Sequence, residues 1–130
     1  MDEKQQIREF QRKVEQTLFR HRSFLDVTSM LQESNARLTR SVMRAVTECG
    51  CIEIRASRQE YSKGLQNSIH KYRSHLYHNL CESCTDLVST EMGKHLFYFT
   101  SLCSLLEIPL SQIFKQELKN LSTLGFFYLR

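Results

Sequence analysis

The stretch Thr85–Leu106, TDLVSTEMGKHLFYFTSLCSLL, is a strongly apolar segment that decides the fold class. Its apolar residues recur mostly at spacings of three and four, the pattern of one face of an α-helix. They are Leu87, Val88, Met92, Leu96, Phe99, Leu102, Cys103 and Leu106. The second half of the segment is apolar almost all round, so it predicts the central helix of a bundle.

The segments on either side carry the same helical periodicity. Pro109 ends the central helix, because proline disfavours helical geometry in the residue before it and suits the first turn of a following helix. Ile52 and Ile54 predict a short extended piece, followed by a loop over residues 55–64. Short connections between antiparallel helices favour a bundle, so we expect an all-α single domain over residues 1–130. The predicted helices span residues 2–20, 23–47, 65–80, 85–106 and 109–125.

Composition narrows the class of protein. The chain has 130 residues, one proline and four glycines, which suits a single compact domain with long regular elements. No apolar run approaches the ~18 residues of a membrane span, and residues 1–12 lack an apolar stretch of signal-peptide type. We therefore expect a cytoplasmic protein without a membrane partner. The chain has a net charge of +4, but lysine and arginine alternate with glutamate and glutamine and form no block of like charges, so nucleic acid is expected to be an unlikely partner that is not excluded.

Four of the five cysteines form two closely spaced pairs, Cys49 with Cys51 and Cys81 with Cys84. Zinc favours four tetrahedral ligands and commonly takes thiolates, so two such pairs predict a closed, structural zinc site. Gly50 permits the tight turn between the first two sulfurs. The predicted fold thus contains a small zinc-clamped insertion over about residues 48–85.

Other interpretations of the cysteines stay open. They could be small buried residues, or the C-x-x-C pair could be redox-active. His78 could replace one cysteine as a ligand, although a solvent-facing histidine is the more common case. Cys103 lies among leucines and is expected in the core, and His95 is expected to be a histidine with an ordinary partner on the central helix.

The run Glu91–Tyr98, EMGKHLFY, with the leucines that follow it, resembles the second half of MazG-type nucleotide pyrophosphohydrolases. The likeness is closer to short, uncharacterised bacterial MazG-like proteins, which have a C-G-C and C-x-x-C framework and a tail similar to Thr123–Phe126. This resemblance implies a MazG-like helical bundle that forms homo-oligomers through its helices. It covers about half of the chain, mostly residues 90–121.

Departures from the family pattern put catalysis in doubt. Glu33 and Glu91 match two of the family's four metal-binding carboxylates, but Ala36 and Lys94 stand where the others are expected. Mg²⁺ needs oxygen ligands, so a Mg²⁺ site is doubtful and no catalytic residue is assigned. The sequence therefore favours a non-catalytic binding or regulatory module, with phosphate contacts from Arg37, Arg40 and Lys94 as a hypothesis. An active nucleoside triphosphate pyrophosphohydrolase and a nucleic-acid-binding regulator are the alternatives.

Overall fold

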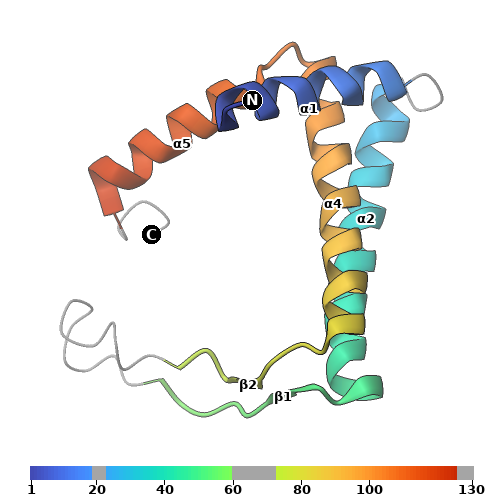
Figure 1. Cartoon of the computed structure of the whole chain (residues 1–130), viewed down its shortest axis with the longest axis vertical. Helices are drawn as coiled ribbons and strands as arrows, with labels where there is room; N and C mark the ends of the chain where they lie inside the picture. Colours follow the sequence, from blue (N-terminus) through green and yellow to red (C-terminus); the bar gives the residue numbers. More distant parts are fainter. Residues whose placement is uncertain (19–22, 60–72, 126–130) are drawn as a thin grey trace. The chain divides into compact units, whose positions relative to one another are not determined.

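The computed structural model describes residues 1–18, 23–59 and 73–125, and these residues are mostly helical (Figure 1). The helices are α1 (Glu3–Thr17), α2 (Phe24–Arg44), a π-helical turn (Ala45–Cys49), α4 (Glu82–Leu105) and α5 (Leu110–Leu124). The strands β1 (Ile52–Ile54) and β2 (Leu76–His78) are three residues long and pair with each other. The prediction of an all-α class is confirmed.

The chain divides into two compact units. The first unit consists of Met1–Ala36 and Met92–Arg130, and the second unit is Arg37–Glu91. The boundaries fall inside α2 and α4, so each of these helices contributes to both units. The insertion expected over about residues 48–85 falls inside the second unit.

The first unit is built around a small apolar core. Helix α1 begins with a capping box, in which the Asp2 side chain accepts a bond from Gln5 N at 2.7 Å and the Gln5 side chain accepts one from Asp2 N. Val14, Leu18 and Val27 are buried, and apolar residues of α1 and α4 pack against them. These partners are Phe10, Phe97, Leu102 and Leu105.

The boundary at Pro109 is confirmed, and the turn there is held by a residue of α1. The Gln11 side chain donates to the carbonyl of Ile108 at 3.0 Å and accepts a bond from Leu110 N at 2.7 Å. Helix α5 follows directly and ends at Gly125, as expected. The tail 126–130 lies outside the described residues.

Helices α4 and α5 expose more apolar surface than a central helix of a closed bundle would. The fully buried positions of α4 include Thr100 and Ser101, whereas Leu96 and Phe99 are 43% and 38% exposed. The helix predicted to be central in the bundle is therefore only partly buried in this single chain. Among the described residues no single helix has the length and apolar composition of a membrane span, and α4 with α5 passes only as a pair bent by 103°.

In the second unit, α2 continues into the π-helical turn and stops at Gly50, as predicted. Gly50 has a left-handed φ of 77°, which glycine adopts without the steric cost of a side chain. The predicted extended piece is β1, which runs antiparallel to β2 with Ile52 opposite His78 and Ile54 opposite Leu76.

The helix predicted over residues 65–80 is wrong for the described part, residues 73–80. These residues contain β2, and His75 and His78 have φ of 62° and 70°, which an α-helix cannot accommodate. Spacing of Leu76 and Leu80 mimics a helical face, but pairing with β1 overrides it. Residues 65–72, including His70, lie outside the described residues.

Candidate metal centre

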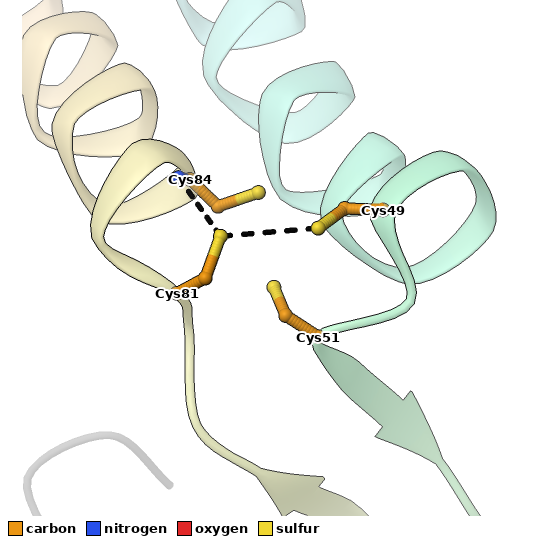
Figure 2. A group of neighbouring side chains, drawn as sticks. All are labelled: Cys49, Cys51, Cys81 and Cys84. Carbon is orange, nitrogen blue, oxygen red and sulfur yellow. Dashed lines mark hydrogen bonds between the residues drawn. The ribbon is translucent and has the colours of Figure 1, made fainter.

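The four cysteines singled out in the sequence converge on one point of the second unit (Figure 2). Cys49 ends the π-helical turn and Cys51 immediately precedes β1, while Cys81 and Cys84 lie at the start of α4. All four Sγ atoms lie within 4.8 Å of one another, and the Sγ atoms of Cys49 and Cys81 are 3.8 Å apart. None of the four is in a disulfide, so the group could hold a metal ion.

The backbone around Gly50 explains how the first pair meets. The carbonyl of Ala45 accepts a hydrogen bond from Gly50 N at 2.8 Å and one from the Cys51 thiol at 3.9 Å. The π-helical turn and the left-handed glycine together reverse the chain between Cys49 and Cys51. Both sulfurs therefore point to the same side, as Figure 2 shows.

The second pair is organised by the first turn of α4. Cys84 N donates to Cys81 Sγ at 3.4 Å, and this bond lowers the pKa of the Cys81 thiol to about 7. A side-chain hydrogen bond with the Cys81 sulfur, together with desolvation, raises the pKa of Cys84 to about 12, because both favour the protonated thiol. A cation bound among the four sulfurs would favour their thiolate forms.

The remaining cysteine, Cys103, and the histidines His78 and His95 lie outside the four-cysteine group. Cys103 is 4% exposed and belongs to the first unit, so its assignment to the core is confirmed. His78 lies in β2 with its Nε2 3.6 Å from Glu53 Oε2, and the four-sulfur group is complete without it. His95 Nδ1 lies 2.8 Å from the buried Ser34 Oγ, the ordinary partnership expected of it.

A cavity of about 630 Å³ in the second unit is lined in part by Cys49, Cys81 and Cys84, so it adjoins the candidate metal position directly. Arg37 and Arg40, the expected phosphate contacts, line it, and so do Arg44 and Glu91. Arg44 is a lining residue that the sequence analysis missed, although spacings of three and four from Arg37 place all three arginines on one helical face. Arg44 also forms an ion pair with Glu48 at 3.0 Å.

Glu33 and Lys94, the remaining expected site residues, belong to the first unit. Both are exposed residues on α2 and α4, respectively. The cavity in the second unit therefore contains only part of the set that the MazG-like pattern suggests.

These features define the class of protein as a mostly helical chain with a candidate four-cysteine metal centre. Comparisons with protein-family models, with curated proteins and with solved structures find no match to the chain. The function is accordingly argued from the chemistry of the site.

Proposed function

We propose that Cys49, Cys51, Cys81 and Cys84 bind one structural zinc ion. Thiolates are soft ligands that select zinc, copper(I) or iron–sulfur chemistry over hard cations such as Mg²⁺. Four protein ligands complete the tetrahedral shell of zinc and leave no position for water, so the ion stabilises the fold without catalysing a reaction.

The spacing of the sulfur atoms is the observation that carries this proposal. Zinc–sulfur bonds of ~2.3 Å in a tetrahedron place neighbouring sulfurs about 3.8 Å apart. The Sγ atoms of Cys49 and Cys81 have this separation, and the other pairs stay below 4.8 Å. A zinc ion can therefore be accommodated with small changes in side-chain torsions.

Elemental analysis of protein purified without added metal tests the proposal, and about one zinc ion per chain is expected. Cys81→Ser should lose most of the zinc and lower the melting temperature, because the metal contributes directly to folding. Cys103→Ala is the matched control, since it removes a buried sulfur from the first unit and should keep full zinc. Iron in place of zinc, or full zinc in Cys81→Ser, would refute the assignment.

For the molecule as a whole, the proposed role is that of a cytoplasmic, MazG-like, non-catalytic binding module. The mostly helical fold is compatible with this family, and Ala36 and Lys94 in place of carboxylates argue against a complete Mg²⁺ site. Homo-oligomerisation is part of the proposal. Its support is the set of exposed apolar side chains on the first unit's helices, Met92, Leu96, Phe99, Phe114, Leu118 and Leu121.

The cavity favours a phosphorylated small molecule, such as a nucleotide, as the ligand of this module. Its volume of about 630 Å³ lies within the range of ~300–1,000 Å³ of small-molecule sites. Arg37 and Arg40 can each bind phosphate oxygens in a two-pronged geometry. Isothermal titration with nucleoside triphosphates should show binding that Arg40→Ala weakens about tenfold and that Arg8→Ala, on α1, leaves unchanged.

The same samples distinguish a binding module from an enzyme. Pyrophosphate release with Mg²⁺, abolished by Glu91→Gln, would replace this proposal with an active pyrophosphohydrolase. Absence of any nucleotide binding by the zinc-loaded protein would refute the ligand and leave the zinc assignment intact.

A further inference from the structure

The net charge of the chain is concentrated in one segment. Residues 55–78 contain five lysines and arginines against a single acidic residue, Glu60, which gives a net charge of +4. This equals the formal charge of the whole protein, so the remaining residues hold 13 basic and 13 acidic side chains. The segment also contains three of the five tyrosines of the chain. The net charge of the whole chain does not reveal this uneven distribution of charge along the sequence.

The described parts of this segment, together with Glu53 and Ile54 of β1, form a paired structure that we call the basic ribbon, residues 53–59 and 73–78. Beyond β1 and β2, Arg55 N donates to His75 O at 2.9 Å and Ser57 N donates to His75 Nδ1 at 3.0 Å. Further along, the Gln59 side chain accepts a bond from Arg73 N at 3.2 Å and donates to Arg73 O. These contacts hold the two chains side by side as far as Gln59 and Arg73.

Cationic side chains dominate the surface of the basic ribbon. Arg55, Arg58 and Arg73 are all exposed, against one acidic residue, Glu53. Glu53 is bound by Arg55 through two contacts of 3.0 Å, so its negative charge is largely offset. The guanidinium of Arg55 also lies over the Tyr77 ring, 4.7 Å from its centroid. A planar stack of this kind, with the exposed Arg58 and Arg73 on the same ribbon, suits a ligand with both phosphates and rings.

We infer that the basic ribbon binds single-stranded nucleic acid. Arginines neutralise the phosphates and release counterions, while an aromatic ring with a stacked guanidinium offers a platform for a base. An anionic membrane would be contacted by an extended apolar face, whereas the ribbon has one exposed apolar pair, Ile54 with Leu76, and otherwise offers mostly arginine, serine, glutamine and histidine. The inference extends the proposed binding module and assumes the zinc clamp, since Cys51 and Cys81 border the ribbon on either side.

Fluorescence anisotropy of zinc-loaded protein with a labelled oligouridine or oligodeoxythymidine tests the inference. Arg58→Glu combined with Arg73→Glu should lower the affinity at least about tenfold and reduce the slope of log K against log salt by about 1.4, at ~0.7 per phosphate contact. Lys4→Glu combined with Arg8→Glu on α1 is the matched control. It changes the net charge equally at exposed positions and should alter the affinity less than about threefold.

Several outcomes would overturn the inference. The inference fails if the wild-type protein does not bind the oligonucleotides at about 50 mM salt, or if both double variants lose affinity equally. It also fails if a duplex binds more tightly than the single strand, or if the protein binds phosphatidylserine vesicles but not the oligonucleotides. The milder pair Arg58→Gln and Arg73→Gln should show an intermediate loss, which guards against misfolding of the charge-reversed variant. Zinc content measured on every sample separates the two proposals, because ribbon variants should keep their zinc while losing the oligonucleotide.

Discussion

At the scale of single residues, Gly50 and Gly93 allow the effect of backbone conformation on stability to be measured apart from the effect of steric crowding. A Cβ added at Gly50 or at Gly93 would meet no heavy atom within 4 Å, so neither position is crowded. Gly50 has a φ of 77°, whereas Gly93 lies inside helix α4. Any difference between alanine substitutions at these sites should therefore come from the backbone.

We expect Gly50→Ala to lower the free energy of unfolding by about 1–2 kcal/mol, since an L-residue pays that cost in left-handed geometry. Gly93→Ala should raise it by up to about 1 kcal/mol, because alanine is the better helix former. Urea denaturation of the zinc-loaded proteins measures both values. Equal effects at the two positions, or a stabilised Gly50→Ala, would contradict the conformation assigned to Gly50.

The sequence best predicts the positions of residues whose spacing along the chain restricts how their side chains can meet. Cys49 and Cys51 flank a glycine, and Cys81 and Cys84 are one helical turn apart, so each pair can meet only in a few ways. Gln11 carries no such signal. It is one polar residue on an amphipathic helix, and its bonds to residues almost 100 positions away exist only in the folded chain.

At the scale of the elements, Gln11 joins α1 to the connection between α4 and α5. Leu110 N is one of the first amide donors of α5, which have no partner within their own helix, and Leu110 is 3% exposed. Gln11 Oε1 accepts from this buried donor at 2.7 Å, and Gln11 Nε2 donates to the carbonyl of Ile108 at 3.0 Å.

Gln11→Ala should therefore lower the free energy of unfolding by about 1–3 kcal/mol, because it leaves a buried amide without its acceptor. Gln116→Ala is the control, since the Gln116 side chain bonds Asn120 on the exposed face of α5 and should contribute much less. Thermal melts of both variants measure the difference. Similar small losses in the two proteins would show that solvent replaces the Gln11 contacts.

Helices were predicted well where local pattern and tertiary packing agree, as in α1, α2 and α5. The prediction failed before Cys81, where apolar spacing indicates a helix but the described residues pair with β1. A strand depends on a partner that is distant in the sequence. Here β1 follows Cys51 and β2 precedes Cys81, so the convergence of the two cysteine pairs brings the strands together. A local period cannot reveal that constraint.

At the scale of the whole molecule, the first unit leaves two regular apolar rows uncovered. Met92, Leu96 and Phe99 on α4 recur at spacings of four and three, and so do Phe114, Leu118 and Leu121 on α5. All six are at least 38% exposed. Such spacing is typical of the seam of packed helices, and exposed patches of this kind mark association surfaces.

The substitution Leu118→Glu, which introduces a negative charge, tests whether a second copy covers these rows. Leu118 is 67% exposed, so the substitution should leave the isolated chain folded while burying a charge in any interface that contains it. We expect light scattering after gel filtration to give a dimer or larger species for the wild type and a monomer for Leu118→Glu. The control Gln112→Glu adds the same charge at another exposed position of α5 and should keep the wild-type mass. A monomeric wild type at high protein concentration would exclude self-association, and the α4 and α5 rows would then need a different partner.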